Sequence, residues 1–331
     1  MNHQYLIFCF VIFVLTFILT FLIKKFALKK IILDIPNNRS SHSTPIPRIG
    51  GLAIAISWFI ALIYFFIQKN INLKLFYALI SGVILVIVGL IDDVFSLKPG
   101  IRFLSQFLTA LIGLIIIGGL KTFDLGFYVF QNKIILTFLA LIGIIWSINL
   151  FNFLDGIDGY ISTEIIFIFL SIFLIFQDNL SLILVFVVLG FLIWNWQPAK
   201  IFMGDVGSTL LGYNVAIFAI YFQNTNKTSL IFWLILTSVF WVDATLTLLR
   251  RWKHKEKLSE AHRKHAYQRI VQYGYSHQQT DIYQIMTNLL ICFPLAFLTI
   301  RYSKFCLLFL GIDILILFVI IKIIDKRKAF E

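Results

Sequence analysis

Charged side chains are scarce in this chain. Only 13% of its 331 residues are Asp, Glu, Lys or Arg, whereas soluble domains contain roughly 25%. Hydrophobic residues make up 60% of the sequence, and the mean hydropathy is +0.92. These values exclude an ordinary soluble protein and predict an all-α protein that crosses a membrane many times.

Cysteine is also rare. The three cysteines, Cys9, Cys292 and Cys306, all lie in apolar segments, and no CxxC pair occurs. Disulfides and a zinc site are therefore not expected. The sequence also lacks a long repeat, a low-complexity tract and a linker, which favours a single membrane domain over residues 1–331.

Long apolar runs fill most of the chain. About 17 to 22 apolar residues make one span, and this length predicts ten or eleven transmembrane helices. They begin near Tyr5, Gly50, Leu75, Phe103, Ile134, Ile161, Leu180, Thr209, Ser229, Gln284 and Phe305. Two pairs of runs meet at 177–179 and at 301–304. The alternative for each pair is a single re-entrant hairpin instead of two spans. The first run is too long for a signal peptide, no Lys or Arg precedes it, and it is expected to remain as an anchor.

Basic residues are divided unequally between the two sides of this predicted bundle. With the amino terminus outside, the inner segments are 24–49, 92–102, 152–160, 196–208, 250–283 and the carboxyl terminus. All of these except 152–160 contain Lys or Arg, and together they hold 21 of the 28 such residues. The positive-inside tendency then predicts a periplasmic amino terminus and a cytoplasmic carboxyl terminus. The bias accounts for the net charge of +12 without nucleic acid. A basic inner surface also suits anionic membrane lipid and a nucleotide diphosphate.

Three acidic segments lie on the same inner side. Residues 149–159 read NLFNFLDGIDG, residues 202–208 read FMGDVGS, and Asp92 and Asp93 follow an apolar run. A carboxylate at membrane depth costs about 2.5 to 3.5 kcal/mol, so a cluster of them implies a function. Asp155 and Asp158 would share a face if 152–159 begins a helix, and the glycines let a ligand approach the backbone. The segments together predict a site for Mg²⁺ and phosphate.

Each polar segment alone also has a structural interpretation. The acidic residues can cap helices in solvated loops or turns. The stretch from His262 to Gln268 can be a basic surface helix on lipid headgroups, and Asp243 can pair with Arg250, Arg251 or a neighbouring helix. Only the gathering of three acidic segments on one side favours a functional site over these alternatives.

Four segments resemble, in order, the signatures of a bacterial enzyme family. They are 89–106 (GLIDDVFSLKPGIRFLSQ), 149–159, 190–208 and 262–268 (HRKHAYQ). The resemblance is to the polyprenyl-phosphate N-acetylhexosamine-1-phosphate transferases. It implies a bundle of ten or eleven helices in the bacterial inner membrane, with the active site facing the cytoplasm. The implied reaction transfers a sugar-1-phosphate from a UDP-sugar to undecaprenyl phosphate and releases UMP.

The resemblance also implies roles for particular residues. Asp205 is expected to bind Mg²⁺, or Mn²⁺ in its place, with Asp155 as a second ligand. The nucleotide and diphosphate pocket would be lined by Asn152, Asp155 and Asp158, with Phe202 stacked on uracil. Asp92, with Asp93 beside it, would be the base that prepares the lipid phosphate. Phosphate oxygens would be held by Arg102, His262 and His265, and the first inner loop would add a wall of Arg39, His42 and Arg48.

Departures from the family pattern bear on the substrate. The peptidoglycan branch has three adjacent histidines, whereas here His262 and His265 are separated. The first inner loop, 38–51 (NRSSHSTPIPRIGG), resembles the O-antigen initiating branch. The expected donor is therefore UDP-N-acetylglucosamine or a C6-deoxy UDP-N-acetylhexosamine such as the QuiNAc or FucNAc derivative. The alternatives are the phospho-MurNAc-pentapeptide transferase and, in another class, a cation or lipid transporter, which should show inverted repeats. A homodimer is left open.

Overall fold

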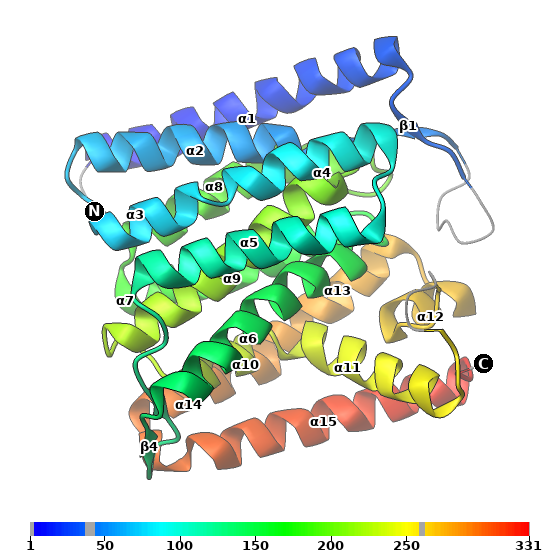
Figure 1. Cartoon of the computed structure of the whole chain (residues 1–331). Coiled ribbons are helices and arrows are strands. Elements are labelled where there is room, and N and C mark those ends of the chain that lie inside the picture. The colour runs from blue at the N-terminus through cyan, green and yellow to red at the C-terminus, as the bar shows by residue number, and fades with distance from the viewer. Residues whose placement is uncertain (1–2, 37–43, 258–261, 331) are drawn as a thin grey trace.

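The protein is a bundle of helices that run side by side. The computed structural model describes residues 3–36, 44–257 and 262–330. The amino and carboxyl termini lie at opposite ends of the bundle, and the β1–β2 hairpin and α12 lie at the same end as the carboxyl terminus (Figure 1). We call this the inner end, because it contains the segments predicted to face the cytoplasm.

The helices of the described residues follow one another with short connections. The first eight are α1 (His3–Lys30), α2 (Gly51–Ile67), α3 (Leu73–Ile80), α4 (Val83–Phe95), α5 (Pro99–Ile117), α6 (Lys133–Phe153), α7 (Tyr160–Phe176) and α8 (Asn179–Asn195). The others are α9 (Gly204–Asn224), α10 (Leu230–Leu236), α11 (Ser238–Lys253), α12 (Ala266–Tyr273), α13 (His277–Thr287), α14 (Phe293–Arg301) and α15 (Cys306–Arg327), with a π-helical turn at Asn288–Cys292 and a 3-10 turn at Ser303–Phe305.

Strands occur only as two short antiparallel hairpins in the described residues. β1 (Leu33–Asp34) pairs with β2 (Ile46–Pro47), and β3 (Phe123–Asp124) pairs with β4 (Val129–Phe130). The hairpins sit between helices and add no layer to the bundle. The predicted all-α architecture is confirmed.

Seven helices of the described residues are long and apolar enough to cross a membrane, or eight if the bent pair α10–α11 counts as one span. Three shorter apolar helices, α2, α7 and α8, have 17 residues each. A helix of this length measures about 26 Å, somewhat less than a hydrocarbon core of about 30 Å. Every predicted span therefore corresponds to an apolar helix or helix pair. The runs that meet near 301–304 form two separate helices, His277–Arg301 and Ser303–Arg327, each long enough to cross.

The helices extend further into the predicted loops than expected. Asp92 and Asp93 lie in the last turn of α4, and residues 250–283 contain the end of α11, all of α12 and the start of α13. The run from Ser229 is not one straight helix, because α10 and α11 meet at 78°. At this break the Trp241 indole donates a hydrogen bond to the Leu234 carbonyl at 2.7 Å. A side chain thus satisfies a backbone group at the bend.

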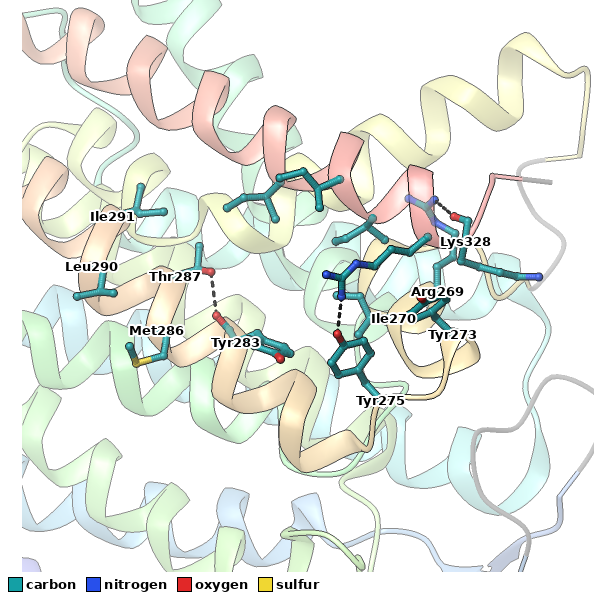
Figure 2. Close-up of a pocket in the computed structure, with 14 residues that line it drawn as sticks. Arg269, Ile270, Tyr273, Tyr275, Tyr283, Met286, Thr287, Leu290, Ile291 and Lys328 are labelled. Atoms are coloured by element: carbon teal, nitrogen blue, oxygen red, sulfur yellow. Dashed lines mark hydrogen bonds between the residues drawn. The ribbon is translucent and has the colours of Figure 1, made fainter.

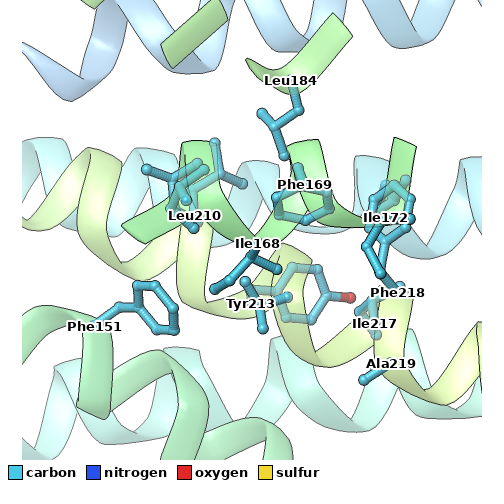
Figure 3. Close-up of a cluster of buried hydrophobic side chains, with 14 of the residues drawn as sticks. Phe151, Ile168, Phe169, Ile172, Leu184, Leu210, Tyr213, Ile217, Phe218 and Ala219 are labelled. Atoms are coloured by element: carbon cyan, nitrogen blue, oxygen red, sulfur yellow. The ribbon is translucent and has the colours of Figure 1, made fainter. Parts of the chain in front are cut away.

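Helix α9 lies at the centre of the bundle. In an apolar stretch of 18 residues in α9, 89% of the residues are buried, against 22% in α1 and 17% in Ser303–Arg327. Figure 3 shows Leu210, Tyr213 and Phe218 of α9 in one apolar cluster with Phe151 of α6 and Phe169 of α7. The residue that begins this helix is therefore held from several sides.

Glycines allow two helices to approach the first turn of α9 closely. A Cβ added to Gly51 of α2 would lie 2.2 Å from the Gly207 nitrogen, and one added to Gly89 of α4 would lie 2.9 Å from the Val206 nitrogen. Both distances are too short for a side chain. This close packing places the ends of α2 and α4 against the start of α9, where Asp205 lies.

Candidate active site

The structure brings predicted site residues from five segments together at the inner end. Asp92 and Asp93 come from α4, Arg102 from α5, Asp155 from the connection 154–159, and Arg48 from the residue after β2. All of them surround Asp205 at the start of α9. Asn152, in the last turn of α6, also hydrogen-bonds to the Asp205 carboxyl.

Asp93 holds the amino terminus of α9. Its carboxylate accepts hydrogen bonds from the backbone N–H of Asp205 at 3.1 Å and of Val206 at 3.4 Å. The Arg48 Nε lies 3.1 Å from the same carboxylate, whose side chain is fully buried. Gly204 has φ +71°, and a Cβ there would lie 2.4 Å from an Asp93 oxygen. Asp93 thus caps α9 and pairs with Arg48, and its expected place beside the base stays a prediction.

Asp92 lies against Asp205 and shares an arginine with it. One Asp92 oxygen accepts the Leu97 N–H at 2.6 Å, and the other lies 3.2 Å from the Arg102 Nη1. The same Arg102 nitrogen lies 3.6 Å from an Asp205 oxygen. The Asp92 and Asp205 carboxyls thus face the same guanidinium nitrogen and interact with each other. A proton, an arginine or a cation is needed where two carboxyls meet in this way.

Negative charge exceeds positive charge in this cluster. The carboxyls of Asp92, Asp93, Asp155 and Asp205 face the guanidinium groups of Arg48 and Arg102. Burial, followed by the charges of Asp205 and Asp93, raises the pKa of Asp155 to about 8, although Arg48 and the Gly204 N–H oppose the shift. A cation bound here would relieve the repulsion that raises this pKa.

The donor set fits Mg²⁺ with a bound phosphate better than a site of protein ligands alone. Among the described residues, no group of three His, Cys, Asp or Glu is arranged to hold a metal ion. Mg²⁺ in enzymes usually takes one or two carboxylates and completes its shell with substrate phosphate and water. Asp205 and Asp155, which lie in the region of excess negative charge, would supply that number.

Polar side chains link the site to neighbouring helices. Asn152 donates a hydrogen bond to the Ser208 hydroxyl at 3.2 Å, and Asn149 donates one to the Gln106 carbonyl oxygen at 2.8 Å. These bonds connect α6 with α9 and with α5. Sequence reasoning assigned no role to Gln106 or Ser208, although both lie inside the quoted motifs.

Asp158 does not share a helix face with Asp155. Helix α6 ends at Phe153 and α7 begins at Tyr160, so residues 154–159 are a connection. Asp158 instead accepts the Ala199 N–H at 3.0 Å and lies 3.4 Å from the Nδ1 of His277. It thus joins the segment before α9 to α13, a contact that the local sequence does not indicate.

The histidine segment is held by Asp243. This carboxylate accepts the backbone N–H of Ala266 at 2.8 Å and of Tyr267 at 3.4 Å, and it lies 3.8 Å from the His265 Nδ1. It therefore pairs with neither Arg250 nor Arg251, which contact Asp325 and Glu256. A helix that merely lies on lipid headgroups is not what the structure shows, because His265 and Tyr267 are buried.

The start of α12 reaches the connection that contains Asp155. The rings of Tyr267 and Tyr160 stack at 4.5 Å, and a Cβ added to Gly156 would lie 2.2 Å from the Tyr267 hydroxyl oxygen. Burial, followed by the charge of His265, lowers the pKa of His262 to about 4, so this ring is neutral near pH 7. In this neutral state His262 can donate a hydrogen bond from its N–H to a phosphate oxygen, but it cannot act as a cation.

Phe202 is tied by its backbone to the segment that contains Arg48. Its N–H donates to the Pro47 carbonyl at 2.8 Å, and its carbonyl accepts the Gly50 N–H at 2.9 Å. Its side chain is half-buried beside the start of α9. Arg39 and His42 lie outside the described residues.

Known proteins resemble the chain over most of its length. Residues 75–223 match glycosyl transferase family 4. A probable undecaprenyl-phosphate N-acetylglucosaminyl 1-phosphate transferase of Bacillus subtilis is 31% identical over 282 residues, which are 80% of this chain and 76% of that protein. The undecaprenyl-phosphate alpha-N-acetylglucosaminyl 1-phosphate transferase of Salmonella typhi is 28% identical over 293 residues, 82% and 77% of the two chains.

A third relative, the enzyme of the same name from Thermotoga maritima, is 31% identical over 199 residues and 60% of each chain. The Bacillus subtilis alignment spans most of both proteins. The resemblance inferred from those motifs is confirmed. The chain belongs to glycosyl transferase family 4 and is a membrane-spanning transferase.

Proposed function

We propose that the protein transfers an N-acetylhexosamine-1-phosphate from a UDP-sugar to undecaprenyl phosphate and releases UMP. One observation carries the proposal. Four carboxyls and two arginines converge on the amino terminus of α9, where the negative excess suits a divalent cation with a diphosphate. The names of the relatives support the same donor and acceptor classes.

The transfer is a phosphoryl displacement. An oxygen of the lipid phosphate attacks the β-phosphorus of the UDP-sugar, the bond from this phosphorus to the bridging oxygen breaks, and UMP leaves with the electron pair. Mg²⁺, or Mn²⁺, when bound would neutralise diphosphate oxygens. Asp205 and Asp155 would hold the ion, and Asn152 would fix the Asp205 carboxyl through its hydrogen bond.

Arg102 is placed to bring the lipid phosphate to Asp92. Its guanidinium lies within 3.6 Å of both Asp92 and Asp205, and its side chain is 39% exposed, so it can turn toward an incoming anion. The second pKa of a phosphate monoester is about 6, so little proton removal is needed near pH 7. Asp92 then acts mainly by orienting Arg102 and accepting the remaining proton.

The donor is expected to be UDP-N-acetylglucosamine or its C6-deoxy relatives, used in the bacterial inner membrane to begin O-antigen or another surface polysaccharide. The separated His262 and His265 and the absence of a large soluble insertion in the sequence argue against a pentapeptide donor. UDP would bind at Asn152, Asp155 and Phe202. The segment that begins α12 would face the sugar, since Tyr267 reaches Gly156.

A donor panel tests the proposal. Purified protein is given undecaprenyl phosphate, Mg²⁺ and one of three UDP-sugars: the N-acetylglucosamine, a C6-deoxy N-acetylhexosamine or the MurNAc-pentapeptide derivative. We expect UMP release with the first or second and a rate at least about tenfold lower with the third. Turnover of the pentapeptide donor at the rate of the best hexosamine would reject the donor assignment. UMP release that needs no lipid acceptor would reject the displacement.

A further inference from the structure

A pocket lies at the inner end, where α12, α13 and α15 meet. Its volume is about 390 Å³, and we call it the corner pocket. Ile270 and Tyr273 of α12, Tyr283 and Met286 of α13, and Ile323 of α15 are among the side chains that line it (Figure 2). Asp92, Asp155 and Asp205 are not among them, so the corner pocket is separate from the candidate active site.

One end of the corner pocket is apolar and open. Met286, Leu290 and Ile291 lie together at this end in Figure 2. Met286 is 47% exposed and Leu290 is 66% exposed. All three belong to the helix His277–Arg301, which is long and apolar enough to span a membrane. In a bilayer this end of the pocket therefore meets acyl chains.

The other end of the corner pocket is basic. Tyr273, Tyr275 and Lys328 lie at this end in Figure 2. Arg327 donates a hydrogen bond to the Tyr275 hydroxyl, and its guanidinium lies 5.9 Å from the Tyr273 ring and 5.8 Å from the Tyr275 ring. These contacts hold the guanidinium in place but leave its charge unbalanced.

The single acidic side chain described at this end is already paired. Asp325 binds Arg250 through two hydrogen bonds at 2.9 and 3.0 Å and Arg269 through one at 2.7 Å. Among residues 3–36, 44–257 and 262–330, no carboxylate forms an ion pair with Arg327 or Lys328. Two positive charges beside an apolar surface thus remain for an anion with a hydrocarbon part.

We propose that the corner pocket binds one anionic phospholipid. Its phosphate would lie at Arg327 and Lys328, where charge-assisted hydrogen bonds are strong, and an acyl chain would lie along Met286 and Leu290. Anionic headgroups are attracted to basic residues that end a membrane helix. Arg269 already joins α12 to α15 through Asp325 and the Lys328 carbonyl at 2.9 Å. A lipid between them would fix α12 to α13 as well.

Lipid retention measured by native mass spectrometry tests this site without reference to activity. Full-length protein is released from vesicles of equal phosphatidylglycerol and phosphatidylcholine. We expect wild-type protein to keep one phosphatidylglycerol and Arg327→Gln to bind it about tenfold more weakly. Lys326→Gln is the matched control: it removes the same charge from the same helix, but Lys326 is exposed and does not line the pocket.

Two further measurements test the same site even if Arg327→Gln folds poorly. Met286→Trp fills the apolar end without a change of charge and should also reduce retention. Phosphatidylglycerol should slow amide hydrogen exchange in α12 of the wild-type protein and not in Met286→Trp. Equal retention of both lipids, equal effects of Arg327→Gln and Lys326→Gln, or displacement of the bound lipid by equimolar undecaprenyl phosphate would each overturn the proposal.

Discussion

The inner end of the molecule has two regions of opposite charge balance. Around Asp205, four carboxyls face two arginines, whereas around Asp325 one carboxylate faces Arg250 and Arg269, with Arg327 and Lys328 left over. Both regions contain ion pairs, so the presence of charge does not distinguish them. The sign of the excess does, because it predicts a cation with diphosphate in the first region and an anionic headgroup in the second.

The two regions are also connected through α12. This helix begins at Ala266, where the neighbouring Tyr267 reaches Gly156 in the connection that contains Asp155, and it ends at Tyr273 in the corner pocket. Asp243 fixes its first turn by accepting the Ala266 N–H, and Asp325 fixes Arg269 in its middle. Because the two regions differ in the sign of their excess charge, a substitution in the acidic region should act first on catalysis and one in the basic region first on lipid binding, with α12 as the link between them.

Removal of the central carboxylate should have the largest effect. Asp205→Asn is expected to lower turnover at least about a hundredfold, because the developing charge loses its cation ligand. UMP release under saturating donor and acceptor measures this. Asp178→Asn is the matched control: Asp178 caps α8 at the opposite end of the bundle through the Ser181 N–H, and Asn serves equally well as a cap. Turnover of Asp205→Asn above a few percent would contradict the assignment.

Substitution of Arg102, the exposed arginine of the acidic region, should have the next largest effect on activity. Arg102→Gln is expected to lower kcat/KM for the lipid acceptor about ten- to hundredfold, because the lipid phosphate loses the guanidinium that would bring it to Asp92. Lys98→Gln provides the comparison, since Lys98 precedes the same helix and is exposed. An equal loss in both variants would indicate a general effect of charge and no contact with phosphate.

The pH dependence of Mg²⁺ binding follows from Asp155. Its pKa is raised to about 8, so in the absence of metal the carboxyl is mostly protonated at pH 6 and becomes ionised as the pH rises. A cation binds the ionised form. The apparent Mg²⁺ affinity should therefore increase up to about tenfold from pH 6 to 7 and less steeply above pH 8. Titrations at fixed ionic strength check this, and an affinity that is constant from pH 6 to 8, or a dependence that persists in Asp155→Asn, would contradict it.

The smallest expected effect comes from a change in the packing of α2 on α9, which positions the acidic region. Gly51→Ala puts a Cβ 2.2 Å from the Gly207 nitrogen and should lower the free energy of unfolding by roughly 1–3 kcal/mol. Gly143→Ala is the matched control, because a Cβ there has no atom within 4 Å. Thermal unfolding in detergent measures both. A Gly51→Ala protein as stable as Gly143→Ala would show that α2 is not packed tightly on α9.

The bundle itself could be predicted from the sequence because each span is encoded locally. An apolar run such as that of α1 or α9 identifies a helix without knowledge of its neighbours. The bend between α10 and α11 could not be predicted in this way, since it depends on where Trp241 meets the Leu234 carbonyl. The sequence also does not show which helices are buried. Both α9 and α15 are apolar, but only α9 is enclosed by other helices.

The candidate site also has features that the sequence predicts and features that it does not. The carboxylates Asp92, Asp155 and Asp205 could be named from their cost at membrane depth and from the family motifs. Their partners could not, because Asp93 caps a helix 112 residues further along the chain and Asp158 contacts His277 across 119 residues. Contacts at such separation are properties of the folded bundle.

The most direct test of the central claim follows the β-phosphorus of the donor. UDP-N-acetylhexosamine labelled with ³²P at the β-phosphate is incubated with the purified protein, undecaprenyl phosphate and Mg²⁺, and the lipid and nucleotide products are separated. The account predicts that the label moves into the lipid with the sugar and that the released UMP is unlabelled, with Asp205→Asn forming neither product. Labelled UDP in the nucleotide fraction, with an unlabelled sugar on the lipid, would show transfer of the sugar alone and would contradict the account.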